Sequence, residues 1–147
     1  MGSRYQGTES EALALNSYIK LQRAANSVTG RVHRYLVQAR LSISQFGVLE
    51  CLYHLGPLCQ RDIGRKILKS SGNISTVIDN LVKRNYVVRQ RSNDDRRYIS
   101  VGLTAFGKAL IEQIFPCHVK EIVARMNTLT AREHQQLSRL CKKLGTS

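Results

Sequence analysis

The segment from residue 71 to residue 83 carries small hydrogen-bonding side chains along one face of a short amphipathic helix. Ile74, Ile78 and Leu81 recur at helical spacing and mark the opposite, apolar face. A helix whose exposed N-terminal half lacks bulky charge can approach the base edges of duplex DNA closely. Capping and plain solvent exposure are the alternative roles, and in Ser71 a cap and a phosphate contact would use the same atoms. The candidate DNA contacts on this helix are Ser71, Asn73, Ser75, Thr76, Asn80 and Lys83.

The segment after this helix predicts a β-hairpin with a charged tip. Residues 86–91 and 98–103 are rich in β-branched and aromatic side chains, and the linker SNDDRR between them is polar and turn-forming. The tip therefore presents Asp95, Arg96 and Arg97 at the end of two strands.

The basic residues concentrate in the same part of the chain. The net charge is +13, and ten of the basic residues but only four of the acidic ones lie within residues 60–100. Such an excess favours polyanions through counterion release, although a solvated basic surface that serves solubility is the alternative. Each basic side chain alone is readily explained by solvation, but as a group they are candidate phosphate contacts: Arg61, Arg65, Lys66, Lys69, Arg89 and Arg91.

Several helices must position these two elements. Residues 9–36 predict one long helix, with a heptad-like seam from Tyr18 to Tyr35 that suits packing in a dimer or, alternatively, in an intramolecular core. Ser42 or Ser44 can cap the next helix, and Gly56 ends it. A two-turn helix from Leu58 and a turn over residues 69–72 are expected to follow.

Two further helices are expected after the hairpin. Thr104 can cap the first, and Pro116 is expected to kink or break it because proline lacks a backbone N–H. Thr130 and Glu133 form a capping box for the last helix. The whole chain, residues 1–147, is expected to be a single domain.

The remaining composition excludes several protein classes. The chain has no apolar run long enough for a membrane span and no secretory signal peptide, so we expect a cytoplasmic protein without a membrane partner. Catalytic motifs and phosphate loops are missing from the sequence, so neither an enzyme nor a cofactor is expected. The four cysteines are expected to be reduced, with Cys51 and Cys141 packed on apolar faces, and no set of ligands is spaced for a metal ion.

The order of these motifs resembles the MarR family, the multiple-antibiotic-resistance type of transcription regulators. The resemblance extends over roughly residues 15–145 and rests on NISTVIDNLVKRNYV, on Asp95-Arg96-Arg97 followed by YISVGLT, and on LTAFGKAL. The run from Leu52 to Val87 and the later IFPCH are similar to the quinone- and phenolic-responsive branch of the family.

This resemblance implies a mainly α fold with a small β-hairpin, an α+β winged helix-turn-helix with long N- and C-terminal dimerisation helices. Residues 42–104 would form the DNA-binding part, and residues 9–37 and 104–145 would hold two copies together. The implied protein is a homodimer, most often a repressor, on a pseudo-palindromic operator of double-stranded DNA, with half-sites roughly 34–36 Å apart. A small aromatic ligand, an oxidant or another effector would release it.

The resemblance also assigns roles to residues. One arginine at the hairpin tip would enter the minor groove, whose negative potential favours a guanidinium, and the other would be held by Asp95 or by Asp79. Either Arg96 or Arg97 could be the arginine that enters the minor groove. An effector would lie between the dimerisation helices and the winged helix. The apolar and aromatic candidates for its pocket, which are equally well explained as core, are Tyr18, Phe46 and Tyr53.

Three other functions remain open. Cys59 lies in the turn before the helix-turn-helix, with Arg61 near it in sequence, and positive charge lowers a thiol pKa, so a redox-sensing repressor is one alternative. The second is an architectural protein that coats DNA without sequence preference. The third is a winged-helix module that binds protein, which the basic charge argues against.

Overall fold

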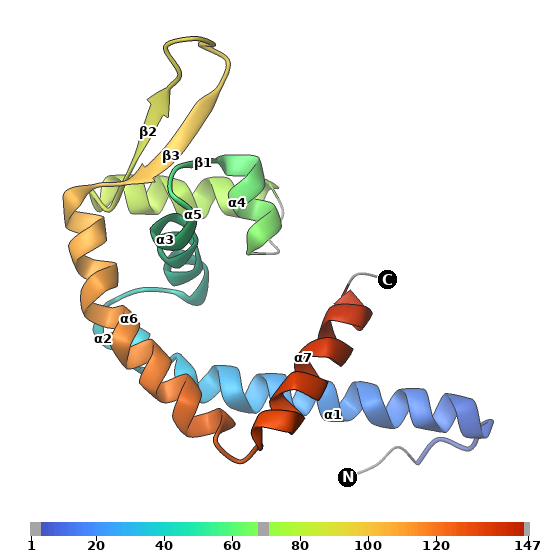
Figure 1. Ribbon diagram of the computed structural model, residues 1–147. Helices are drawn as coiled ribbons and strands as arrows, with labels where there is room; N and C mark the ends of the chain where they lie inside the picture. The colour runs from blue at the N-terminus through green and yellow to red at the C-terminus, as the bar shows by residue number, and fades with distance from the viewer. Residues whose placement is uncertain (1–3, 68–70, 146–147) are drawn as a thin grey trace. The chain divides into compact units, whose positions relative to one another are not determined.

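The computed structural model describes residues 4–67 and 71–145 (Figure 1). The chain divides into two compact units, one formed by residues 33–117 and the other by the segments before and after it. Each unit is described by itself below.

The unit formed by residues 33–117 contains a small three-stranded antiparallel sheet and the helices that pack beside it. The strands are β1 (Leu58–Cys59), β2 (Val87–Arg91) and β3 (Ile99–Leu103), in the order β1-β3-β2. The helices are α2 (Arg34–Gln38), α3 (Ile43–Leu55), α4 (Gln60–Lys66), α5 (Ser71–Lys83) and the first part of α6 (Ala105–Met126). In Figure 1, β2 and β3 extend beyond α5 as a hairpin. The fold is the expected one, mainly helical with a small β-hairpin.

The apolar face of α5 anchors this helix in the hydrophobic core. Ile74, Ile78 and Leu81 are at most 1% exposed, as the helical spacing predicts. Burial of a side chain of this size contributes about 1.5–3 kcal/mol to folding. The core residues that surround them are Leu36, Leu41, Phe46, Val48, Leu49, Leu52, Ile63, Val87, Val101 and Ile111.

Side-chain caps fix where three of the helices begin. Ser42 accepts a hydrogen bond from the backbone N–H of Gln45, and the Gln45 side chain accepts one from the backbone N–H of Ser42, at 3.1 and 2.9 Å. Thr104 caps α6 by accepting from the backbone N–H of Gly107 at 2.9 Å. The predicted capping box of Thr130 and Glu133 is also present, at 2.8 and 3.3 Å. These bonds satisfy N–H groups that have no partner within their helices.

Two predictions about the segment between α3 and α5 were wrong. Leu58 and Cys59 form strand β1, which pairs with Val101 and Ser100 of β3, so the helix begins at Gln60 instead of Leu58. The pairing covers one edge of β3 and satisfies its backbone groups, a long-range effect that local helix propensity does not reveal. In the predicted turn over residues 69–72, Ser71 already begins α5, whereas residue 69 lies outside the described residues.

The second unit contains α1 (Glu9–Val32), the end of α6, and α7 (Ala131–Gly145). The expected single helix over residues 9–36 is wrong, because α1 ends at Val32 and α2 is a separate helix from Arg34. Pro116 was expected to kink or break its helix; α6 continues through it, so the break is wrong, while the kink stays a prediction. Pro116 is exposed, so water can satisfy the carbonyl group that loses its helical partner. Across the described residues, no helix has both the length and the apolar character of a membrane span.

Candidate nucleic-acid interface

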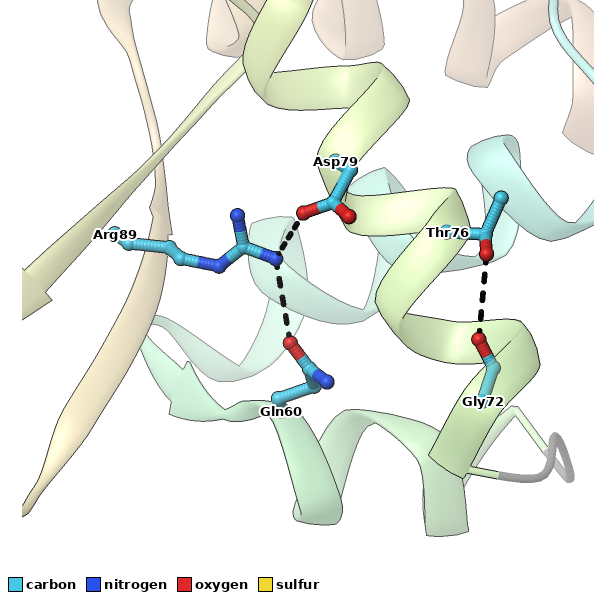
Figure 2. Close-up of polar contacts among 5 residues, drawn as sticks. All are labelled: Gln60, Gly72, Thr76, Asp79 and Arg89. Carbon is cyan, nitrogen blue, oxygen red and sulfur yellow. Dashed lines mark hydrogen bonds and ion pairs between the residues drawn. The ribbon is translucent and has the colours of Figure 1, made fainter.

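The exposed face of α5 carries most of the predicted base-contacting side chains. Asn73, Thr76, Asn80 and Lys83 are exposed, and Ser75 is half-buried. The hydroxyl of Thr76 donates to the carbonyl oxygen of Gly72 one turn earlier, at 3.4 Å, which leaves its lone pairs able to accept (Figure 2). Asn73 lies inside the first turn of α5 and is therefore not its cap. The predicted contact through the Ser71 side chain lies outside what the structure describes.

An ion pair joins α5 to the hairpin. Nη2 of Arg89, on β2, lies 2.6 Å from Oδ1 of Asp79 on α5, and the same nitrogen donates to Oε1 of Gln60 on α4 at 3.4 Å (Figure 2). The partner of Asp79 is thus Arg89, and the expectation that Asp79 would hold Arg96 or Arg97 is wrong. The reason is register: Arg89 lies in the middle of β2, opposite Val101, and within reach of Asp79 on α5, whereas Arg96 and Arg97 follow the end of the strand.

The ion pair contributes little to the stability of the fold, and we expect its main effect to be on the orientation of the hairpin. Its two side chains are 33% and 50% exposed, and ion pairs with this exposure contribute about 0.2–1 kcal/mol to stability. Arg89, which the sequence suggested as a phosphate contact, is instead engaged in holding three elements together. Its exposed part can still face a phosphate group.

A double-mutant cycle will measure this ion pair. We expect Arg89→Gln and Asp79→Asn each to lower the free energy of unfolding slightly, with a coupling energy below about 1 kcal/mol in urea denaturation. The same cycle measured on DNA affinity should show a larger coupling, because loss of either partner frees the hairpin from α5. Equal coupling in both measurements would contradict an orienting role.

Hydrogen bonds between residues close together in the sequence shape the hairpin tip. The hydroxyl oxygen of Ser92 accepts from the backbone N–H groups of Asp94 and Asp95, at 3.2 and 3.4 Å. Oδ1 of Asp95 accepts from the backbone N–H of Arg97 at 2.9 Å, and the backbone N–H of Tyr98 donates to the carbonyl oxygen of Asp95 at 3.0 Å. Asp95 therefore holds the backbone of the tip and not a guanidinium group.

Arg96 and Arg97 both extend from this tip. Both are exposed, and within residues 4–67 and 71–145 neither guanidinium forms an ion pair. The expectation that one of the two is anchored by a carboxylate is therefore not met in the described structure. The described structure thus leaves both guanidinium groups exposed to solvent at the tip.

The remaining phosphate candidates lie on α4 and at the end of β2. Arg61, Arg65 and Lys66 are exposed on α4, and Arg91 is exposed at the end of β2. Nη1 of Arg65 lies 3.9 Å from Oδ1 of Asp62, a long contact that leaves the guanidinium available. Lys69 lies outside the described residues.

The cysteines differ in their surroundings. Burial raises the pKa of the Cys51 thiol; the charge of Lys66 partly offsets this effect by lowering the pKa, whereas Glu50 adds a smaller increase. Cys59 is half-buried in the N-cap position of α4, where its side chain makes no capping hydrogen bond. Cys117 and Cys141 are exposed, so the prediction that Cys141 is buried packing was wrong for the described chain. In the part of the chain that the structure describes, no three candidate ligands gather in a way that suits a metal ion.

Thiol reactivity will test this difference. Because only the thiolate attacks an alkylating reagent, a raised pKa slows the reaction at a given pH. We expect iodoacetamide at pH 8 to label Cys51 several-fold more slowly than Cys117 in the folded protein, measured by peptide mass spectrometry. In denaturant the two rates should converge. Equal rates in the folded protein would contradict the prediction.

The three residues suggested for an effector pocket do not share one cavity. Phe46 is 2% exposed in the hydrophobic core, so the core interpretation holds for it. Tyr53 packs its ring against His54 and Phe115, with centroids 5.1 and 6.1 Å away. Tyr18 lines an apolar groove of about 390 Å³ in the other unit. The groove lies between α1 and α7 and is lined by Ala14, Ser17, Tyr18, Leu21, Leu137, Leu140, Cys141 and Leu144.

Sequence reasoning missed two features of the unit formed by residues 33–117. One is a cavity of about 350 Å³ between α2 and α6. The other is Arg84, directly after α5, whose guanidinium binds backbone carbonyl groups more than forty positions earlier in the chain. Neither has a local sequence signal, because both depend on the packing of distant segments.

Comparison with known proteins places this architecture among transcription regulators. A sequence model of the MarR family matches residues 41–99. The regulator MhqR of Bacillus subtilis is 33% identical over 132 residues, which cover 90% of this chain and 91% of that protein.

Solved structures share the fold at lower identity. AbsC, a MarR family regulator from Streptomyces coelicolor, superposes with a TM-score of 0.84 at 19% identity, over 98% of this chain and 97% of its own. BpsR of Bordetella bronchiseptica, whose DNA binding is regulated by 6-hydroxynicotinic acid, superposes with a TM-score of 0.82 at 22% identity, over 97% and 99%.

Proposed function

The chain belongs to the MarR family of DNA-binding transcriptional regulators, and on that premise we propose a homodimeric repressor that a small hydroxylated aromatic compound releases from its operator. Its relatives and its family are regulators and not enzymes. The single observation that best supports the proposal is the exposed polar face of α5, held beside a basic hairpin by the ion pair between Asp79 and Arg89.

DNA reading divides between α5 and the hairpin. Asn73, Thr76 and Asn80 carry amide and hydroxyl groups that can pair with base edges in the major groove. Arg96 and Arg97 lie at the tip, and a guanidinium there suits the negative potential of a narrow minor groove. The exposed basic residues of α4 contact phosphates, which sets position on the duplex without reading sequence.

Dimerisation is proposed through residues 9–37 and 104–145. The groove between α1 and α7 is apolar, and leucines on both helices remain exposed in the single chain, among them Leu13 at 63%, Leu140 at 50% and Leu144 at 62%. A second copy would cover these side chains, whose exposure is otherwise unfavourable. Leu140→Glu would put a charge in that interface, so light scattering should then report a monomer.

The effector is proposed to be a small hydroxylated aromatic compound. This part of the proposal rests on the structural likeness to BpsR, which responds to 6-hydroxynicotinic acid, and on the sequence resemblance to the phenolic-responsive branch. Redox control through Cys59 is a competing route. It predicts that Cys59→Ser abolishes the response to an oxidant, whereas the aromatic effector should act equally on that variant.

To test the proposed function, the affinity of the protein for fragments of the promoters nearest its own coding sequence is compared with its affinity for random duplex DNA of equal length. We expect a specificity ratio above about a thousandfold at physiological salt, and a footprint with two half-sites one helical turn apart. Equal affinity for both duplexes would favour an architectural protein, because salt-sensitive binding alone does not distinguish the two. Lack of affinity for any duplex at low salt would favour a protein-binding module.

A further inference from the structure

Helices α2 and α5 end in the same way, and each end contains a left-handed residue. Each closes with a backbone N–H that donates at 3.0 Å to a carbonyl oxygen five residues earlier, from Leu41 after α2 and from Tyr86 after α5. The residue before each donor is left-handed, Arg40 with φ of 54° and Asn85 with φ of 60°. Within the described ranges, no other residue except glycine has a positive φ. A non-glycine residue keeps this conformation where the surrounding structure holds it.

Arg84 binds the end of α2 through its planar guanidinium. Nη1 donates to the carbonyl oxygen of Arg40 at 2.6 Å, and Nη2 donates to that of Ala39 at 3.4 Å. Carbonyl groups at the end of a helix have no partner within it, and a charged donor forms a stronger hydrogen bond than a neutral one. Because Arg84 directly follows α5, its half-buried side chain fastens the end of α5 to the end of α2.

The same segment fastens the end of α5 to the start of α6. The guanidinium of Arg84 lies 4.9 Å from the centre of the Tyr86 ring, and that ring stacks on Phe106 of α6 with centroids 5.1 Å apart. The hydroxyl of Thr104, directly before α6, donates to the carbonyl oxygen of Asn85 at 2.7 Å. The end of α5 is therefore held on two sides, by α2 and by α6.

Helices α2 and α6 are the segments through which this unit continues into the rest of the chain. α1 ends at Val32, two residues before α2 begins, and α6 continues past residue 117 into the other unit. Both segments therefore lead to the helices that are proposed to hold two copies together. Arg84 contacts the first segment directly and the second through Tyr86.

The ion pair between Asp79 and Arg89 acts within one copy of the DNA-reading unit. It joins α5 to the hairpin, and both of these elements contact the same half-site in the proposed complex. Arg84 instead joins α5 to the segments that lead towards the second copy. The two arginines should therefore affect different properties of DNA binding.

We infer that Arg84 is a positioning residue that determines which spacing of two half-sites the homodimer accepts. The inference rests on the proposed function, because it requires two copies on one operator. Each α5 can read its own half-site, but both bind at once only where their separation matches that of the half-sites. Loss of Arg84 leaves α5 anchored in the core by Ile74, Ile78 and Leu81 and loosens its end. The two copies then discriminate less between operators of different spacing.

The test uses the full-length protein and three duplexes of equal length. The first is the operator, the second has one base pair inserted between the half-sites, and the third has one half-site replaced by random sequence. The insertion moves one half-site by about 3.4 Å along the helix axis. Fluorescence anisotropy at fixed salt gives the three affinities. The unmodified protein should prefer the operator over the inserted duplex by about a hundredfold, because a wrong spacing prevents simultaneous binding.

Two variants of Arg84 and one matched control separate positioning from charge. Arg84→Gln removes the guanidinium, so the preference for the operator over the inserted duplex should fall below about tenfold, while affinity for the single half-site changes by less than about threefold. Arg84→Lys keeps the charge without the planar fork, so its preference should be intermediate. Arg40→Gln removes one charge from an exposed side chain but keeps the carbonyl group that accepts from Arg84, so the full preference should remain.

A purely structural role of Arg84 gives a different result. If Arg84→Gln weakens binding to all three duplexes by the same factor, or if Arg40→Gln loses the spacing preference as well, the inference is wrong. If circular dichroism shows that Arg84→Gln is unfolded, Arg84→Lys decides, and a full preference in that variant overturns the inference. Failure of the unmodified protein to prefer the operator over random duplex, or over the single half-site, would instead overturn the proposed function.

Discussion

Replacing both Arg96 and Arg97 by alanine is expected to lower operator affinity by about a hundredfold, with the fold unchanged. Both side chains are exposed at the hairpin tip, so their loss costs no core packing. Loss of an arginine contact with a groove costs about 1–3 kcal/mol of binding free energy. A dimer places two tips on one operator, so about 1.5 kcal/mol at each amounts to roughly a hundredfold.

The single variants will show which arginine enters the minor groove. Asp95 accepts from the backbone N–H of Arg97, a bond that Arg97→Ala retains, so both single variants should keep the shape of the tip. The arginine in the groove should account for most of the lost affinity, and most of the lost preference for A·T-rich flanks. The other should reduce affinity for all sequences equally and lower the salt slope.

The matched control removes two arginines from another surface. Arg132 and Arg139 are both exposed on α7, so their double replacement by alanine changes the net charge by the same amount. Anisotropy titrations at fixed salt should show a change of less than threefold for this control. If the two double variants weaken binding equally, general electrostatic attraction explains the effect and the tip has no special role.

The local features of α5 and the hairpin were predictable from the sequence. The spacing of Ile74, Ile78 and Leu81 identified the buried face of α5, and the β-branched runs placed both strands of the hairpin within one residue of their observed bounds. Periodicity and capping depend on neighbours three or four positions away, and the sequence displays these directly.

Features that depend on distant partners were not predictable. Strand β1 exists because β3 offers an unpaired edge about forty residues later. Asp79 pairs with Arg89 because of the hairpin register, although Arg96 and Arg97 are equally basic. The sequence alone is equally consistent with Phe46 as a pocket residue and as a core residue, and only the packing around it shows that it is a core residue. The same holds for Arg84, whose acceptors are carbonyl groups and therefore carry no side-chain signal.

The close approach of α6 to the end of α5 leads to the largest stability effect that we expect. Gly107 of α6 lies directly against the carbonyl group of Tyr86, which also accepts hydrogen bonds from the backbone N–H and the hydroxyl of Thr104, at 3.1 and 3.2 Å. A Cβ atom at position 107 would overlap the Tyr86 oxygen and lie 2.8 Å from its carbonyl carbon. Both of these Tyr86 atoms belong to the backbone, so neither can move aside by a side-chain rotation.

Gly107→Ala should therefore lower the free energy of unfolding by about 3 kcal/mol, at the upper end of the usual cost of overpacking. Urea denaturation followed by circular dichroism will measure it. Gly47→Ala is the matched control, since Gly47 also lies inside a helix of this unit and its Cβ would meet only the Ile67 side chain, at ordinary contact distances of 3.5 and 3.9 Å. Because alanine favours helix over glycine by about 1 kcal/mol, the control should be neutral or stabilising. If both substitutions stabilise the protein, α6 does not pack against the carbonyl group of Tyr86 as described.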